Sequence, residues 1–208
     1  GDERMGFLAA VGFSVMPSFH GSGQFMTIDS PYFTFWILTC YLAWRAVERQ
    51  DEGRSATWFW ACVGLALGIG VLFKYTILLL VPGLALFFIV RRIGGGGAPA
   101  ARDLLLACLL MLAATSPVVI WNQRQGWPTV AHLLGHVGAA GGDMRPSQFW
   151  YYNPVWTLTF LAGPFIALGP VGGYLLYRKI DWVLHDATWW RKCDTPRLFL
   201  ICCAVPLL

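Results

Sequence analysis

In Met26-Thr27-Ile28-Asp29-Ser30-Pro31-Tyr32-Phe33-Thr34-Phe35-Trp36, one acidic residue stands directly before a long apolar segment. No other acidic residue occurs from position 4 to position 47. Ser30 and Pro31 predict a helix start, because serine is a favoured N-cap and proline fits the first helical position. We therefore expect Asp29 on the turn that opens an apolar helix, where the partly positive N-terminus favours its charge. An alternative interpretation is that Asp29 does no more than stabilise this helix start.

The composition indicates a membrane protein. The chain of 208 residues is 57% hydrophobic and only 12% charged, whereas soluble domains have about 25% charged residues. The 11 tryptophans and 14 phenylalanines agree, since aromatic residues gather at membrane interfaces. None of the six cysteines forms a Cys-x-x-Cys pair, so neither a disulfide framework nor a zinc site is indicated. The net charge of +4 indicates no particular partner, and we expect no nucleic-acid partner.

Seven apolar segments are candidates for membrane spans, which need about 20 residues each. The fold class is therefore predicted to be all-α, a polytopic transmembrane helix bundle with about seven spans. We expect residues 1–208 to form a single transmembrane domain and to be a fragment of a larger multi-span protein, because both ends lie beside or within apolar segments. The candidate segments are 5–19, 31–46, 58–73, 76–90, 104–121, 154–177 and 198–208.

Lysine and arginine divide unevenly between the two sides that alternating spans define. Cytoplasmic loops are rich in these residues, so the richer side is predicted to be cytoplasmic. The chain is then a multi-pass protein of the inner (plasma) membrane, with Asp29 and Lys74 extracytoplasmic. Of the 15 residues, the richer side holds Arg4, Arg45, Arg49, Arg54, Arg91, Arg92, Arg102, Arg178, Lys179, Arg191, Lys192 and Arg197, and the other side holds Lys74, Arg124 and Arg145.

Three features on the predicted outer side carry candidate chemistry: Asp29, Lys74 and the loop of residues 122–152. Lys74 is a lone ammonium between two apolar segments, which suits a phosphate group, although a lysine there can also simply extend to the lipid head groups. Asn122 is placed either to bind a sugar or to cap the preceding helix. Apolar residues at helical spacing between positions 123 and 136 predict a short helix on the membrane surface.

Several short blocks, taken in order, resemble bacterial membrane glycosyltransferases. They are similar to glycosyltransferase family 39, the dolichyl-phosphate-mannose–protein mannosyltransferase-like group, which includes the lipid A aminoarabinose transferases. The resemblance covers roughly residues 5 to 165. The blocks are Met26-Thr27-Ile28-Asp29-Ser30-Pro31 with Trp36, Gly64-Leu65-Ala66-Leu67-Gly68 with Lys74-Tyr75-Thr76, and Pro117-Val118-Val119-Ile120-Trp121-Asn122 with Gly126-Trp127.

The resemblance implies a C-type glycosyltransferase fold with its active site on the outer face. The implied donor is a polyprenyl-phosphate-linked sugar, and the acceptor is a protein, a lipid or a glycan. Asp29 matches the family's second acidic site and is the candidate catalytic residue. Lys74 with Tyr75 matches the donor-phosphate position, and Asn122 and His136 are the candidate substrate-binding residues. The family's main acid lies in a first outer loop that this chain lacks, so we do not expect the fragment to be active alone.

Other functions and a metal site stay open at this stage. No cofactor is required by the resemblance, and a divalent metal is an option because metal dependence varies among such enzymes. His20 and Asp29 have no spacing typical of a metal site. A polytopic transporter is the alternative function, but transporters place ionisable residues within their spans and often contain repeats, and neither feature is present. A non-catalytic assembly subunit would leave the outer Asp29 and Lys74 unexplained.

The charge distribution predicts the orientation of the chain in the membrane. Cysteines introduced at positions 51 and 141, in a background without the native cysteines, should differ in labelling by an impermeant thiol reagent applied to intact cells. We expect position 141 to be labelled and position 51 to be protected. Labelling at position 51 but not at position 141 would reverse the orientation.

Overall fold

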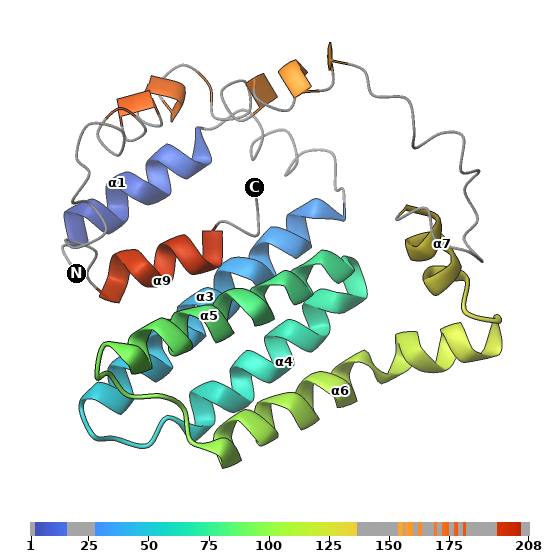
Figure 1. The fold of residues 1–208 in the computed structure, drawn as a ribbon, viewed down its shortest axis with the longest axis horizontal. Helices are drawn as coiled ribbons and strands as arrows, with labels where there is room; N and C mark the ends of the chain where they lie inside the picture. The colour runs from blue at the N-terminus through green and yellow to red at the C-terminus, as the bar shows by residue number, and fades with distance from the viewer. Residues whose placement is uncertain are drawn as a thin grey trace. The chain divides into compact units, whose positions relative to one another are not determined.

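The computed structural model describes residues 3–15, 28–136 and 195–204, with short pieces between 154 and 181 (Figure 1). All regular elements in these parts are helices, and no strand occurs among them. The all-α class is therefore confirmed. The chain divides into two compact units, one from residues 1–25 and 118–187 and the other from residues 26–117 and 188–208. The predicted span 154–177 lies largely outside the described residues.

The second unit contains most of the described helices. Its elements are α3 (Asp29–Asp51), α4 (Thr57–Phe73), the 3₁₀ helix η1 (Tyr75–Leu79), α5 (Leu80–Ile93), the first part of α6 (Ala101–Arg124) and α9 (Thr195–Ala204). The first unit contains α1 (Glu3–Ser14), the last turns of α6 and α7 (Pro128–His136).

The helix α3 forms because its buried residues recur at helical spacing. Tyr32, Trp36, Thr39, Ala43 and Val47 are all buried, and intervals of three or four residues place them on one face. Rings join this face to its neighbours: Trp44 of α3 and Phe87 of α5 each contact Phe199 of α9, with ring centroids 5.3 and 5.1 Å apart. The core of this unit lies between α3, α4, α5 and α9, with Trp60, Val63 and Leu67 of α4 among its buried residues.

Glycines let α4 approach α6 closely. A Cβ atom added to Gly64 would lie 2.1 Å from the carbonyl oxygen of Ala107, and one added to Gly68 would lie 2.6 Å from the Cβ atom of Ala114. A small residue at every fourth position is a common device for close packing of membrane helices. The block Gly64-Leu65-Ala66-Leu67-Gly68 is thus explained by packing.

Two turns at the same end of this unit are built alike. At the end of α3, the N–H groups of Gly53 and Arg54 donate to the carbonyls of Gln50 and Arg49, and at the end of α5 those of Gly95 and Gly96 donate to Arg92 and Arg91. This pair of bonds is the Schellman motif, which requires the positive φ that glycine adopts readily, here 68° at Gly53 and 83° at Gly95. We call this end, with Arg45, Arg49, Arg54, Arg91, Arg92 and Arg102, the arginine end.

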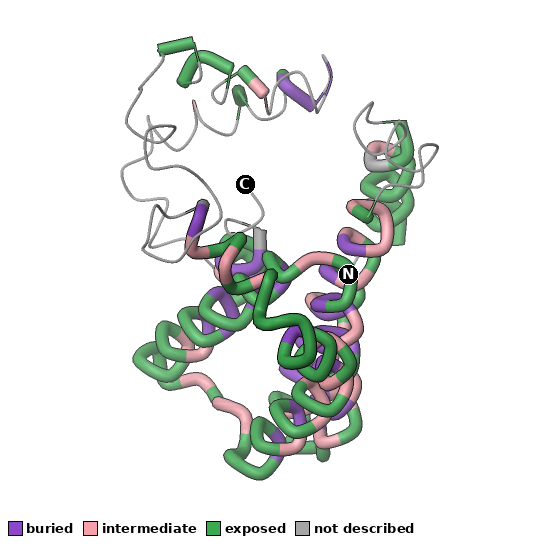
Figure 2. Tube along the Cα trace, turned by 90° about the vertical axis from the view of Figure 1, so that its right-hand side faces the viewer, coloured by how far each residue is buried: buried purple, intermediate pink, exposed green. Residues whose placement is uncertain are grey.

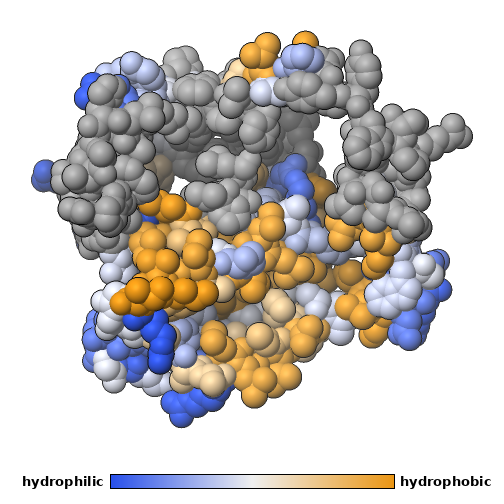
Figure 3. All heavy atoms as spheres, in the orientation of Figure 1, coloured by the Kyte–Doolittle hydropathy of each residue, from blue (hydrophilic) through white to orange (hydrophobic). Residues whose placement is uncertain are grey.

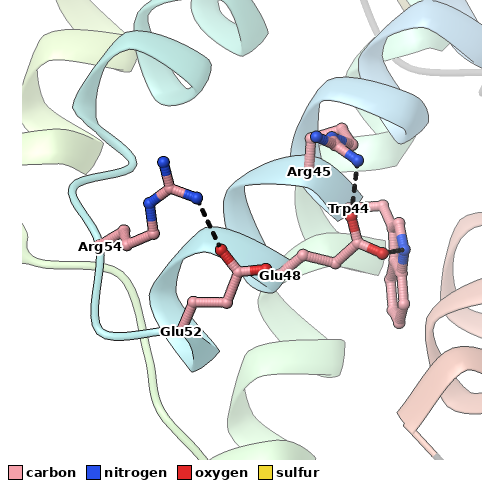
Figure 4. A network of polar contacts seen from close by, with 5 residues as sticks. All are labelled: Trp44, Arg45, Glu48, Glu52 and Arg54. Carbon is pink, nitrogen blue, oxygen red and sulfur yellow. Dashed lines mark hydrogen bonds and ion pairs between the residues drawn. The ribbon is translucent and has the colours of Figure 1, made fainter.

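Polar contacts hold the helices together at the arginine end. An ion pair joins Arg91 of α5 to Asp51 of α3, and Thr57 Oγ1 of α4 donates to Asp103 Oδ1 of α6 at 2.7 Å. These contacts show that α3 and α5 end where α4 and α6 begin, as alternating spans require. Figure 4 shows neighbouring contacts, in which Glu48 bonds Trp44 and Arg45 and Glu52 bonds Arg54. In Figure 3 hydrophilic residues gather toward the lower left, where these turns lie, and hydrophobic residues cover much of the face above them.

In the described residues, two helices are long and apolar enough to cross a membrane: Tyr75–Ile93 and Ala101–Arg124. Thr57–Phe73 is apolar but shorter. Exposed and buried residues alternate along the helices of this unit (Figure 2), and the exposed face of α6 carries Leu105, Leu109 and Leu112. Lipid would cover such a face, but seven spans stay a prediction.

The start of α3 differs from the predicted one. The helix begins at Asp29, with Ile28 at the N-cap and no side-chain bond from the N-cap residue. The prediction of Ser30 as N-cap is therefore wrong by two positions. The first intrahelical bond runs from the Tyr32 N–H to the Ile28 carbonyl, so Pro31 still lies where no N–H is used. Asp29 keeps the predicted place in the first turn.

The glycine contact between α4 and α6 predicts a large effect for a small substitution. Gly64→Ala should lower the melting temperature of the detergent-solubilised protein, because the Ala107 backbone cannot move away without displacing α6; overpacking of this kind costs about 1–3 kcal/mol. Gly12→Ala in α1 is the control, since its added Cβ atom meets nothing within 4 Å. Equal melting temperatures for Gly64→Ala and the wild type would contradict this packing.

Candidate active site

Asp29 and Lys74, which lie 45 positions apart in the sequence, form an ion pair at the end opposite the arginines. The Nζ atom of Lys74 donates to Oδ1 of Asp29 at 2.7 Å, and the two side chains are 40% and 37% exposed. Asp29 is the first residue of α3, and Lys74 follows the last residue of α4. The antiparallel arrangement of α3 and α4 brings both residues to one end. The structure therefore joins the two residues that the sequence singled out.

The position of Lys74 is set by a tight turn. Its N–H donates to the Gly70 carbonyl at 3.1 Å, its own carbonyl accepts from Ile77 at 3.2 Å, and its backbone is extended, with φ −154° and ψ 123°. The fully buried Ile77 packs against Gly70, where an added Cβ atom would lie 2.2 Å from Ile77 Cδ1. A lysine held on both sides by helical turns projects from a defined backbone position.

Two aromatic side chains of α3 link the Lys74 ammonium to α9. The Lys74 ammonium lies 5.3 Å from the ring centroid of Tyr32, and Tyr32 contacts the edge of Trp36 at 5.6 Å. The indole N–H of Trp36 in turn donates to the Cys203 carbonyl of α9 at 3.1 Å. A cation over an aromatic ring is worth about 0.5–1 kcal/mol at exposed sites. These contacts orient the ammonium and connect it to the core.

The role of Tyr32 was not predicted from the sequence, although a signal was present. Tyr32 follows Asp29 by three positions, which places both side chains on the same face of a helix. It is only 6% exposed, so its ring is a fixed support rather than a mobile contact. The missing information was that Lys74 would lie over this face.

The Asp29–Lys74 pair is accessible and easily exchanged. Solvent-exposed ion pairs contribute only about 0–1 kcal/mol, because water screens the charges and both side chains lose freedom. The helix N-terminus adds a favourable interaction with the Asp29 carboxylate. A ligand with a stronger negative charge could therefore take Lys74 from Asp29 at little cost and leave the carboxylate free to accept a proton.

Tyr75 is the first residue of η1 and is 46% exposed. It directly follows Lys74 in the sequence. His136 is the last residue of α7, and its side chain lies outside the described part of the chain. The roles of Tyr75 and His136 stay predictions.

Asn122 makes structural bonds within the first unit. It is only 3% exposed; its Nδ2 donates to the Val118 carbonyl at 3.0 Å, and its Oδ1 accepts from the Thr129 N–H at 3.1 Å. The side chain thus joins the last turn of α6 to the first turn of α7. Gly126 and Trp127 form the turn between them, with φ 74° and 63°. This geometry agrees with the capping alternative, and a sugar contact by Asn122 stays a prediction.

No metal-binding cluster occurs in the described residues. No three histidine, cysteine, aspartate or glutamate side chains gather there in a way that could hold an ion. His20 lies outside those residues.

The comparisons identify the family. A family model described as dolichyl-phosphate-mannose-protein mannosyltransferase matches residues 2–121, which is more than half of the 208 residues. The match includes Asp29, Lys74 and Tyr75, and it ends one residue before Asn122. Comparison with curated proteins gives no significant match, and comparison with solved structures gives none either.

The two bonds of Asn122 predict how its replacement should act. Asn122→Ala should destabilise the protein by about 0.5–1.5 kcal/mol per lost bond, because it removes the acceptor of the half-buried Thr129 N–H and the donor to the Val118 carbonyl. Gln123→Ala is the matched control, since the neighbouring amide is exposed. Thermal unfolding of the purified variants measures the effect. An unchanged melting temperature together with lost sugar transfer would instead assign Asn122 to substrate binding.

Proposed function

The chain belongs to the dolichyl-phosphate-mannose-protein mannosyltransferase family of membrane glycosyltransferases, and from this premise we propose its donor, its reacting residues and the side on which it acts. The proposed reaction moves a sugar from a polyprenyl-phosphate donor to a hydroxyl group of a protein, lipid or glycan acceptor. The proposed location is the outer face of the membrane. Family membership also replaces the transporter alternative, which no described feature favours.

The Asp29–Lys74 pair is the observation that carries this proposal. It offers a cation and a carboxylate in direct contact, both accessible, at the end of the helices away from the arginines. Transfer from a lipid phosphate needs these two groups: a cation for the phosphate and a base for the acceptor hydroxyl. The helix ends also fit a lipid-linked donor, whose phosphate lies at the membrane surface while its chain stays among the apolar residues.

The proposed steps begin with donor binding. A phosphate oxygen of the donor replaces Asp29 as the partner of the Lys74 ammonium, which the Tyr32 ring keeps in place. The released Asp29 carboxylate accepts the proton of the acceptor hydroxyl. The hydroxyl oxygen then attacks the anomeric carbon, and the bond from that carbon to the phosphate oxygen breaks. The phosphate takes the electron pair, and Lys74 stabilises the charge that develops on it.

The charge distribution supports the proposed outer location. The structure brings six arginines to one end of the α3–α6 helices and Asp29 with Lys74 to the other. Since arginine-rich loops lie on the cytoplasmic side, the ion pair is proposed to face outward. A polyprenyl-phosphate donor on that side would make a nucleotide sugar unnecessary.

Replacement of either charged residue should lower sugar transfer without unfolding the protein. We expect Asp29→Asn in the full-length protein to reduce turnover by up to about 10²–10⁴-fold, the range of general base catalysis. Lys74→Ala should weaken donor binding, and Lys74→Arg should restore only part of it because the guanidinium differs in shape and hydration. Glu52→Gln, which breaks an exposed ion pair at the arginine end, is the control.

Exchanging the charges of Asp29 and Lys74 distinguishes a catalytic ion pair from a structural one. The double variant Asp29→Lys with Lys74→Asp restores an ion pair but places each charge on the wrong helix end. A catalytic pair predicts that the double variant unfolds at a temperature close to that of the wild type and stays inactive. Recovery of activity in the double variant would reduce Asp29 and Lys74 to a structural ion pair, and wild-type turnover in Asp29→Asn would remove Asp29 from the reaction.

A further inference from the structure

The helix α9 is bonded to an aromatic side chain that lies behind the candidate active site. Trp36 of α3 is only 3% exposed, and its indole N–H donates to the Cys203 carbonyl of α9 at 3.1 Å. That carbonyl lies in the last turn of α9, where a helix offers no N–H of its own. A buried indole N–H in turn needs an acceptor. The bond therefore satisfies both groups and fixes the end of α9 against the first half of α3.

Two more contacts hold α9 along the same face of α3. The thiols of Cys40 and Cys203 are hydrogen-bonded to each other. Farther along α3, the ring of Trp44 contacts Phe199, with centroids 5.3 Å apart. Trp36, Cys40 and Trp44 follow one another at intervals of four residues, which places them on one face of the helix. The positions on α9 fall as those on α3 rise, so the two helices run antiparallel and the end of α9 meets the early turns of α3.

Trp36 connects this contact to the ammonium group of Lys74. Its ring meets the Tyr32 ring edge-on, with centroids 5.6 Å apart, and the Lys74 Nζ atom lies 5.3 Å from the Tyr32 centroid. Tyr32 and Trp36 are both buried, so neither ring turns independently of its neighbours. A rotation of the Trp36 ring would therefore displace the ring that lies under the ammonium.

We propose that Trp36 is a positioning residue for Lys74, and that α9 acts through Trp36 on the binding of the donor phosphate. The phosphate part of this proposal rests on the proposed function, whereas the part on the position of the ammonium does not. An ammonium that is already held in place loses less freedom when a phosphate binds. Because α9 lies outside the residues that the family model matches, the site would depend on a segment beyond the matched part of the chain.

An NMR signal of Lys74 tests its position without any assay of sugar transfer. The lysines of the purified full-length protein are dimethylated with a ¹³C label, which keeps their charge, and the signal lost in Lys74→Arg belongs to Lys74. A ring shifts the signal of a group above its face upfield, so Tyr32→Leu should move the Lys74 signal toward that of exposed lysines. Trp36→Phe, which keeps a ring but removes the N–H, should move it the same way by a smaller amount. An unchanged signal in Trp36→Phe would overturn the proposal.

Trp44→Phe is the matched control. Trp44 is a tryptophan of the same helix that also contacts α9, but its indole N–H donates to Glu48 at 2.9 Å, toward the arginine end. Its replacement should leave the Lys74 signal at the wild-type position. A shift in Trp44→Phe as large as that in Trp36→Phe would show that any loosening of α9 moves the ammonium, and would overturn the specific role of Trp36.

Binding of undecaprenyl phosphate, a lipid phosphate without a sugar, tests the consequence for the donor. Trp36→Phe should raise its Kd about two- to fivefold, the factor that corresponds to a cation–π contact of about 0.5–1 kcal/mol. A variant that is only less stable would contain fewer binding molecules but keep the wild-type Kd. An unchanged Kd in a variant whose Lys74 signal has moved would overturn the link to the donor.

The two measurements separate this proposal from the proposed function. If the wild type does not bind undecaprenyl phosphate, the proposed donor class fails. A Lys74 signal that moves in Trp36→Phe but not in Trp44→Phe would still establish that Trp36 positions the ammonium.

Discussion

Gly70 lets the side chains of Ile77 and Phe35 lie against the backbone of α4, and the candidate active site depends on this contact. Ile77 is the centre of η1, so its burial determines where the chain turns after α4. Phe35 comes from α3 and its ring stacks on Phe73, the last residue of α4, at 5.7 Å. The second turn of α3 and the end of α4 are therefore held together close to the charged pair, since Phe73 directly precedes Lys74, and the pair itself need contribute little stability.

The sequence predicted the charged residues of this site better than their surroundings. Asp29 and Lys74 stand out because each is alone in a long apolar region, and their joint location follows from alternating helices. Tyr32 could not be recognised in the same way, since an aromatic residue in an apolar helix is ordinary until a cation is found above it. The prediction that Ser30 is the N-cap was wrong because the start of a helix can shift by one or two residues when several neighbouring residues fit the first turn.

The helices themselves followed from composition and spacing, but their contacts did not. The predicted segment 58–73 agrees with α4 to within one residue. Nothing in its sequence, however, distinguishes Gly64 and Gly68, which contact α6, from Gly70, which contacts η1. Asn122 shows the same limit. Its two bonds depend on the turn at Gly126 and Trp127, and a positive φ at a tryptophan is not predictable from residue type. One side-chain bond within α6 does have a local cause. Because Pro117 has no N–H to donate to the Ala113 carbonyl, that carbonyl accepts a bond from Ser116 Oγ at 2.8 Å instead.

The paired turns at Gly53 and Gly95 give the arginines a second effect. Arg49 and Arg91 occupy the same position before the two glycines, so each side chain lies in the last turn of its helix, where the carbonyl ends of the peptide dipoles are negative. The positive charges from which the orientation of the chain is predicted therefore also stabilise the helices that end there. Neutralising Arg49 or Arg91 would therefore weaken the charge bias behind the predicted orientation and also remove a favourable interaction at a helix end.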